Sequence, residues 1–213
     1  MRFLAPTGLV LSLAMAACFS PSSDNDDEGT SAAGTTMAAA TAADESTTAV
    51  VAVPSCSEYC GLITDHCDGA ESQYSGATAC EAVCEVLPPG TVDDELGNTV
   101  GCRTYHSIVA AEEPETHCVH AGAGGSGVCG APCESFCGLA AQLCTGDDQQ
   151  YADTEACLAE CMMFPDDVPT STEATEGDSY ACRLYHLTVA ALQPDVHCPH
   201  IVLDSPVCVA AGG

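Results

Sequence analysis

The chain has 213 residues with 31 acidic side chains, three arginines and no lysine, which gives a formal net charge of −28. Nucleic acids and anionic membrane surfaces are bound through clustered lysine and arginine, so this composition argues against both classes of partner. The 17 cysteines form neither tandem Cys-x-x-Cys zinc pairs nor the Cys-x-x-Cys-His run of haem attachment, and they therefore predict a disulfide framework in an oxidising compartment.

Residues 1–17 are predicted to form a signal peptide. Arg2 supplies a positive charge near the start, and the mostly apolar run after it ends in small residues and is too short to span a bilayer. The segment Ala14 to Cys18 resembles the lipobox of bacterial lipoproteins. This resemblance implies cleavage before Cys18 and lipidation of that cysteine.

The number of cysteines supports the lipidation of Cys18. Without it, 16 cysteines remain (17 − 1), and they divide into eight and eight along the chain. The alternative is ordinary cleavage after Ala16, which would leave Cys18 as an odd thiol. Lipoproteins of this type that stay in the inner membrane often carry aspartate after the lipidated cysteine. Here Phe19 follows instead, so the resemblance implies an anchor in the outer membrane.

The segment from Cys18 to residue 54 is predicted to be a disordered tether. It consists largely of serine, threonine, alanine, glycine and acidic residues, and no apolar face recurs at a helical or strand period. Such a segment cannot bury enough apolar surface to offset the entropy lost on ordering.

The rest of the chain is a tandem duplication, with repeat 1 at residues 55–129, repeat 2 at 132–208 and a tail at 209–213. The first five cysteines of the two copies lie 77 residues apart, the next two 80 apart and the last 79 apart. Such a match within one chain indicates two copies of one structural unit. The cysteines are Cys56, Cys60, Cys67, Cys80, Cys84, Cys102, Cys118 and Cys129 in repeat 1, and Cys133, Cys137, Cys144, Cys157, Cys161, Cys182, Cys198 and Cys208 in repeat 2.

Each repeat is predicted to be a three-helix unit, which makes the fold all-α, small and disulfide-rich. In repeat 1 the helices are expected at about 56–67, 77–86 and 99–112, followed by Pro114 and a short turn. Ser55 is suited to cap the first helix, and Asn98 or Thr99 the third. A unit of under 80 residues with few aromatic side chains has a thin core, so disulfides are expected to supply much of its stability.

The first two predicted helices each carry a Cys-x3-Cys pair, and this arrangement resembles the α-hairpinins. In that family two antiparallel helices are joined by an outer and an inner disulfide. The resemblance implies the pairs Cys56–Cys84 and Cys60–Cys80, with Cys133–Cys161 and Cys137–Cys157 in the second copy. The partners of the other four cysteines in each repeat stay open, because eight cysteines allow 105 pairings.

Six of the seven histidines occupy equivalent positions in the two copies, and so do Arg103 and Arg183. Three imidazoles suit Zn²⁺ or Cu²⁺, so one hypothesis is a metal or haem site in each repeat. The alternative is structural: core histidines that bond carbonyl groups around a disulfide, and arginines that pair with a local acid or cap a helix or loop. The histidines are His106, His117 and His120 in repeat 1, and His186, His197 and His200 in repeat 2.

No catalytic residues are predicted, since no nucleophile–base pair or recurring carboxylate pair stands out, and the protein is not expected to be an enzyme. The whole pattern resembles the cysteine-rich lipoproteins of myxobacteria, which implies a cell-envelope location and no activity. The first hypothesis is therefore a lipid-anchored structural or interaction protein without a cofactor. Its expected contacts are the membrane through the anchor and a protein or cell-surface partner, with no nucleic acid. The second hypothesis is an extracytoplasmic module that binds zinc, copper or haem.

Overall fold

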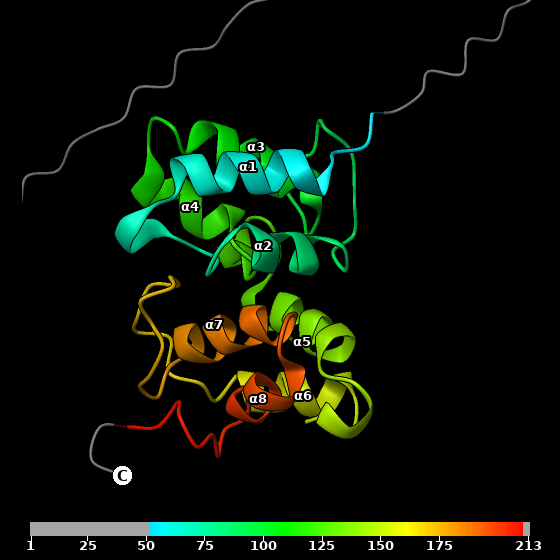
Figure 1. Cartoon of the computed structure of the whole chain (residues 1–213), viewed down its shortest axis with the longest axis vertical. Helices are drawn as coiled ribbons and strands as arrows, with labels where there is room; N and C mark the ends of the chain where they lie inside the picture. The colour runs from blue at the N-terminus through cyan, green and yellow to red at the C-terminus, as the bar shows by residue number, and fades with distance from the viewer. Residues whose placement is uncertain (1–51, 211–213) are drawn as a thin grey trace, which may run out of the picture. The chain divides into compact units, whose positions relative to one another are not determined.

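The computed structural model of the chain describes residues 52–210, and within this range it contains eight α-helices and no strand (Figure 1). The predicted all-α class is confirmed. The predicted signal peptide, the proposed lipidation site Cys18 and almost all of the predicted tether lie outside the described residues. Among the helices between residues 52 and 210, none combines the length and the apolar character needed to cross a membrane.

Repeat 1 contains four α-helices. They are α1 (Cys56–His66), α2 (Ala77–Cys84), α3 (Val100–Val109) and α4 (Pro114–Ala121), with short 3₁₀ turns at Gly69–Glu71 and Gly125–Gly127. The predicted caps are present: the Ser55 hydroxyl accepts a hydrogen bond from the Glu58 amide at 3.2 Å, and Thr99 accepts one from the Cys102 amide at 3.1 Å. Helix α1 packs against both α2 and α3 (Figure 1).

Repeat 2 follows the same order. Its helices are α5 (Pro132–Leu143), α6 (Thr154–Cys161), α7 (Tyr180–Ala190) and α8 (Pro194–His197), with 3₁₀ turns at Gly146–Asp148 and Cys198–His200. The copies also contact each other, since the Gln73 side-chain amide donates to the Thr170 carbonyl at 2.8 Å and the Thr172 amide donates to the Ser72 carbonyl at 2.7 Å.

The fourth helix of repeat 1 differs from the short turn predicted there. Pro114 occupies the first turn of α4, where its fixed φ favours a helix and its missing N–H costs nothing. The helix then runs on to Ala121. In repeat 2 the second residue after His197 is Pro199, which has no N–H for a bond to the carbonyl four residues earlier. The α-helix therefore ends at His197 and a 3₁₀ turn continues the chain.

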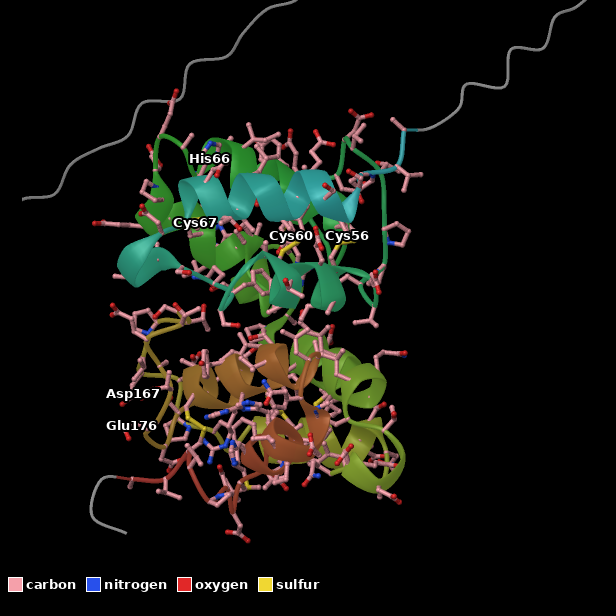
Figure 2. All side chains as sticks on the ribbon, viewed as in Figure 1. Cys56, Cys60, His66, Cys67, Asp167 and Glu176 are labelled. Carbon is pink, nitrogen blue, oxygen red and sulfur yellow. A yellow bond between two sulfur atoms is a disulfide. The ribbon has the colours of Figure 1, made fainter. Side chains whose placement is uncertain are left out.

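Eight disulfides tie these helices together. In repeat 1, Cys56 bonds Cys84 and Cys60 bonds Cys80, which are the pairs that the α-hairpinin resemblance implies (Figure 2). The partners left open by the sequence are Cys67–Cys118, which joins the C-terminal end of α1 to α4, and Cys102–Cys129, which joins α3 to the chain just after the Gly125–Gly127 turn. The equivalent pairs in repeat 2 are Cys133–Cys161, Cys137–Cys157, Cys144–Cys198 and Cys182–Cys208. A native disulfide typically contributes about 2–4 kcal/mol, so these bonds supply stability that the thin core lacks.

The two arginines of the repeats are fully buried, and each donates hydrogen bonds to the loop that follows the second and third histidines of its repeat. Arg103 donates to the carbonyls of Gly122, Ala123 and Thr99 at 3.1, 2.9 and 3.2 Å. Arg183 donates in the same way to four carbonyls, those of Val202, Ser179, Leu203 and Cys208. It also lies 2.9 Å from Asp178 and over the ring of Phe164. These contacts match the structural interpretation of the arginines.

Candidate metal centre

The three histidines of each repeat come from two neighbouring elements. His106 lies on α3 and is buried, with 6% of its surface exposed, whereas His117 and His120 lie on α4 and are half-buried. Because residues three apart share one face of a helix, His117 and His120 both point from α4 toward His106. In repeat 2, His186 on α7 is equally buried. His197 is the last residue of α8, and His200 is the last residue of the 3₁₀ turn that follows it.

In repeat 1 the imidazole rings converge on one point. Nδ1 of His106 lies 3.0 Å from Nδ1 of His117, and the His120 ring stands edge-on to that of His106 with centroids 5.1 Å apart. One ring nitrogen from each of the three residues lies within 4.8 Å of the other two. Nδ1 of His120 is buried and has no hydrogen-bond partner among the described residues.

Repeat 2 has the same arrangement with closer contacts. Nδ1 of His186 lies 2.9 Å from Nδ1 of His197 and 3.2 Å from Nδ1 of His200. The His186 and His200 ring centroids are 4.5 Å apart. Here too one ring nitrogen from each of the three residues lies within 4.8 Å of the other two, so both copies bring three imidazoles together.

A backbone carbonyl fixes the tautomer of the buried histidine in each repeat. Nε2 of His106 lies 3.2 Å from the carbonyl oxygen of Glu95, and Nε2 of His186 lies 3.1 Å from that of Thr175. A carbonyl only accepts, so Nε2 carries the proton, and in the neutral ring Nδ1 keeps a free lone pair. That lone pair faces the other two imidazoles. The same second contact orients histidines that bind metal ions in other proteins.

Burial also keeps these imidazoles neutral. It lowers the pKa of His106, and its nearness to His117 lowers it further, although the Glu95 carbonyl acts in the opposite direction. Burial also lowers the pKa of His120, and it lowers the pKa of His186 to about 4. Neutral imidazole is the form that binds metal ions, so the lowered pKa of His106, His120 and His186 favours the coordinating form of these three rings.

The metal-free protein is expected to lose stability as the pH falls from about 6.5 to about 4. The pKa of His186 is about 4 in the folded chain and near 6.5 when unfolded, so the unfolded chain binds more protons between these values. As the pH falls below 6.5, protonation of His186 stabilises the unfolded chain, whereas the folded chain keeps this ring neutral until the pH nears 4. The free energy of unfolding therefore decreases across this range. Urea unfolding in the presence of a chelator, from pH 7.5 to 4, measures this loss.

The variant His186→Gln separates this effect from the titration of the many carboxylates. Its urea midpoint should change less over the same pH range than that of the unmodified chain. An identical pH dependence in both proteins would show that His186 does not contribute.

The nitrogen–nitrogen distances match those around a single transition-metal ion. Zinc–imidazole bonds are about 2.0–2.1 Å long, so two nitrogens on one ion lie about 3.3 Å apart at a tetrahedral angle and about 2.9 Å apart at a right angle. The Nδ1 separations of 2.9, 3.0 and 3.2 Å fall in this interval. Hydrogen bonding alone explains the cluster less well, because one Nδ1 lone pair accepts only one well-directed bond and three nitrogens converge.

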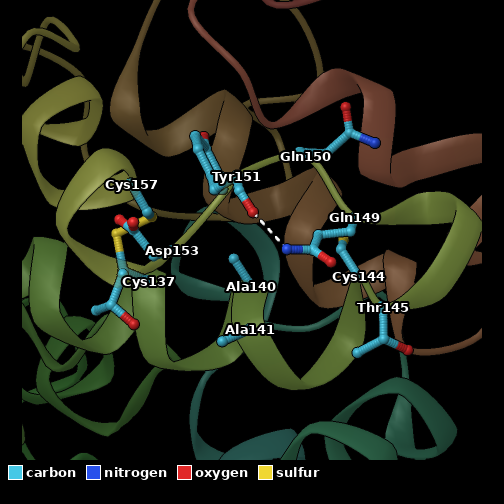
Figure 3. Close-up of a pocket in the computed structure, with 11 residues that line it drawn as sticks. Cys137, Ala140, Ala141, Cys144, Thr145, Gln149, Gln150, Tyr151, Asp153 and Cys157 are labelled. Atoms are coloured by element: carbon cyan, nitrogen blue, oxygen red, sulfur yellow. Dashed lines mark hydrogen bonds between the residues drawn. A yellow bond between two sulfur atoms is a disulfide. The ribbon is translucent and has the colours of Figure 1, made fainter.

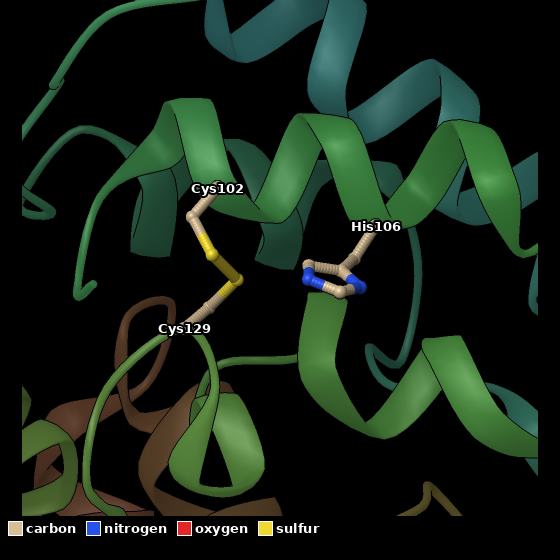
Figure 4. Close-up of side chains that lie close together, drawn as sticks. All are labelled: Cys102, His106 and Cys129. Atoms are coloured by element: carbon tan, nitrogen blue, oxygen red, sulfur yellow. A yellow bond between two sulfur atoms is a disulfide. The ribbon is translucent and has the colours of Figure 1, made fainter. Parts of the chain in front are cut away.

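Cysteine sulfur lies near the cluster but offers no thiolate. Cys102, His106 and Cys129 have donor atoms within 4.8 Å of one another, and Figure 4 shows the sulfur atoms beside the ring. The two cysteines are bonded to each other, and Cys118 between the other histidines is bonded to Cys67. Since the thiolate is the ligand form of cysteine, the metal-binding donors of the repeat are imidazoles.

One carboxylate distinguishes the two clusters. Oε2 of Glu113, the residue just before α4, lies 3.9 Å from Nε2 of His117, whereas repeat 2 has Gln193 at the equivalent position. A carboxylate at the second ring nitrogen raises the basicity of a metal-binding histidine. The sequence shows this difference, but the acid is one of 31 and only the structure places it beside His117.

Exchanging Glu113 and Gln193 between the repeats is expected to reverse the difference in zinc affinity between the two sites. Glu113→Gln should weaken zinc binding in repeat 1 about tenfold, and Gln193→Glu should strengthen zinc binding in repeat 2. Contacts of this kind change metal affinity about 10–100-fold, and the low end is expected here because Glu113 is exposed. Competition with a chelator dye measures each site alone, in a His197→Ala background for repeat 1 and a His117→Ala background for repeat 2. Equal affinities before and after both changes would contradict a role for the carboxylate.

The cavity drawn in Figure 3 lies elsewhere in repeat 2. It has a volume of about 170 Å³ between α5 and the α6 segment, and its lining includes Ala140, Cys144, Tyr151 and Asp153 but no histidine. The Gln149 amide donates to the Tyr151 carbonyl at 2.7 Å across it. The cavity therefore adds no chemistry to the histidine clusters.

Comparison with known proteins places the repeats in a described family. The sequence pattern described as the BfoA family C-terminal domain matches residues 27–132 and again residues 130–209. The chain belongs to the BfoA family. The first match takes in repeat 1 together with part of the segment before it, and the second takes in repeat 2, so each match contains four disulfides and one cluster of three histidines.

Several relatives of this family are fungal. The chain is 37% identical over 71 residues to Bifonsecin B biosynthesis cluster protein A of Aspergillus brasiliensis, and 38% identical over 72 residues to Aurasperone B biosynthesis cluster protein A of Aspergillus niger. It is also 30% identical over 79 residues to an EGF-like domain-containing protein of Acanthamoeba polyphaga mimivirus. These alignments cover 33%, 33% and 36% of this chain and 24%, 23% and 15% of the relatives.

The matched stretch is thus about a quarter or less of each relative. No solved structure matches the chain. The matches support a cysteine-rich protein of the BfoA family, and they give no support to the resemblance to bacterial lipoproteins with a lipobox.

Proposed function

We propose that this protein is a transition-metal-binding module with one site per repeat. The observation that carries the proposal is the convergence of three imidazoles in both repeats: one ring nitrogen from each lies within 4.8 Å of the other two, and the Nδ1 separations of 2.9–3.2 Å suit one ion. His106, His117 and His120 would hold the ion in repeat 1, and His186, His197 and His200 would hold it in repeat 2.

Zinc and divalent copper fit this donor set best. Imidazole suits both ions, and sites made only of imidazole without thiolate or carboxylate disfavour magnesium and calcium. Haem fits less well than a bare ion, because the ring nitrogens lie within 4.8 Å of one another and leave no space for a macrocycle between the rings. The net charge of −28 raises the local concentration of cations around the protein and so supports capture of the ion.

The disulfides support a site that exists before the ion binds. Cys102 lies one turn before His106 on α3 and bonds Cys129, and Cys118 lies next to His117 and bonds Cys67. Both histidine-bearing helices are therefore held by covalent bonds. Binding then costs little ordering entropy, and a disulfide framework suits the oxidising location that the sequence predicts.

A lipid anchor at Cys18 and a place at the cell envelope stay predictions of the sequence. Fungal relatives do not favour them, and an exported protein without the anchor is the simpler proposal with this family. The relatives' names connect them with biosynthesis clusters for bifonsecin B and aurasperone B, and they name no reaction. We therefore propose binding rather than catalysis. A structural or interaction protein without a metal is the alternative.

Equilibrium dialysis of the full chain, produced with its disulfides formed, tests the proposal. Two zinc ions per chain are expected, and the variant His66→Ala should bind two as well. His66 is the matched control, because it is the one histidine outside the clusters and its Nδ1 contacts the Ser107 carbonyl at 2.8 Å. Absence of stoichiometric zinc and copper in a folded chain would overturn the proposal and leave the structural alternative.

A further inference from the structure

We infer that the ion in each repeat keeps a coordination position open to solvent, and that this position takes a small singly charged anion. The inference rests on the proposed function and adds a second ligand to the same site. It would make each repeat a centre that binds an exchangeable ligand, and not a closed structural site.

The first argument is the number of donors. Within residues 52–210, the donor clusters around these histidines consist of three imidazoles, and the only further side chains that cluster with His106 or His186 are cysteines already bonded in disulfides. Structural zinc sites in proteins have four protein ligands, whereas zinc held by three protein ligands carries water or another exchangeable ligand in the fourth position. The site found here has the second composition.

The second argument is the geometry of the three nitrogens. In repeat 2, His186 Nδ1 lies 2.9 and 3.2 Å from the other two Nδ1 atoms, and one ring nitrogen of each residue lies within 4.8 Å of the other two. With bonds of about 2.0–2.1 Å, an ion bound to all three nitrogens at tetrahedral angles lies out of their plane. All three donors then lie on one side of the ion, and the opposite side has no imidazole.

The third argument is where the cluster lies in the repeat. His106 and His186 are buried, but their partners on the next element are only half-buried, and 23% of the His117 side chain is exposed. The cluster is therefore closed on the side of α3 or α7 and reaches the surface on the side of α4 or α8. Solvent and small ions can reach it from there.

Charge selects the ligand that would bind. Three neutral imidazoles leave the full charge of a divalent ion, which favours an anion over a neutral ligand at the open position. The chain itself carries a formal charge of −28, and this opposes multiply charged anions more strongly than singly charged ones. The five cavities described among residues 52–210 have no histidine in their linings, so none of them adjoins these six side chains.

Cobalt substitution tests the inference with azide as the probe. The full chain is loaded with Co²⁺ and titrated with sodium azide at constant ionic strength, while the visible ligand-field bands are recorded. We expect these bands to shift and to saturate with one azide for each bound cobalt. Sulfate at the same ionic strength should leave them unchanged.

The outcomes separate this inference from the proposed function. Bound cobalt whose spectrum does not respond to azide would show a closed site, which overturns the inference and leaves metal binding in place. Failure to bind cobalt, zinc or copper would overturn both. The variant His117→Ala/His197→Ala should show neither bound cobalt nor an azide response, which ties the signal to the histidine clusters.

Discussion

Replacing His117 by alanine is expected to reduce the zinc bound by the full chain from two ions to one, and His117→Ala/His197→Ala is expected to bind none. Each change removes one of three ligands from one site. Contacts outside the ligand set already alter metal affinity about 10–100-fold, so loss of a ligand should weaken the affected site more than 100-fold. Equilibrium dialysis at micromolar free zinc measures the remaining stoichiometry.

These two residues are chosen because they are half-buried. Alanine at either position removes less packing than alanine at the buried His106 or His186, so the fold is expected to persist. Circular dichroism and the count of free thiols check this for every variant, with His66→Ala carried through as the control. Two zinc ions still bound by the folded double variant would place the metal outside the histidine clusters.

The sequence predicted most of the fold because its strongest signals are local. Ser55 and Thr99 cap their helices as expected, and the disulfides between α1 and α2 are the pairs that the α-hairpinin resemblance implied. It did not predict α4 as a helix, because a proline can begin a short turn as readily as a helix. The length of the helix that begins at Pro114 is set by the residues after it, and in repeat 2 Pro199 ends the equivalent helix early.

The members of the candidate site were also visible in the sequence, but their convergence was not. Recurrence at equivalent positions singled out His106, His117 and His120, whereas the distances between their nitrogens depend on how α3 packs on α4. The backbone carbonyls of Glu95 and Thr175 fix the buried rings, and these two residues share no side-chain chemistry that a sequence comparison could detect.

The buried arginines connect the stability of each repeat to its histidine cluster. Arg103 lies next to Cys102 on α3, about one turn before His106, and its guanidinium holds the loop after α4 through the carbonyls of Gly122 and Ala123. The same loop leads to Cys129, which bonds back to α3. One cation and one disulfide thus fix the C-terminal end of α4 relative to the helix that carries the buried histidine.

Arg103→Met is therefore expected to lower the free energy of unfolding by about 3 kcal/mol. The change keeps most of the side-chain volume but leaves the Gly122 and Ala123 carbonyls without a donor, at about 1–3 kcal/mol for each buried group. Removing a buried cation offsets part of that loss, because its desolvation no longer has to be overcome. Urea unfolding of the metal-free chain with its disulfides intact measures the difference.

Arg103→Lys is the matched variant, because it keeps the positive charge but not the planar donors. A single ammonium group cannot reproduce the guanidinium contacts to Gly122, Ala123 and Thr99, so this variant should also be destabilised. If charge alone were responsible, lysine would restore full stability. A loss below about 1 kcal/mol in both variants would show that the loop keeps its conformation without the guanidinium, and the role assigned to Arg103 would then be wrong.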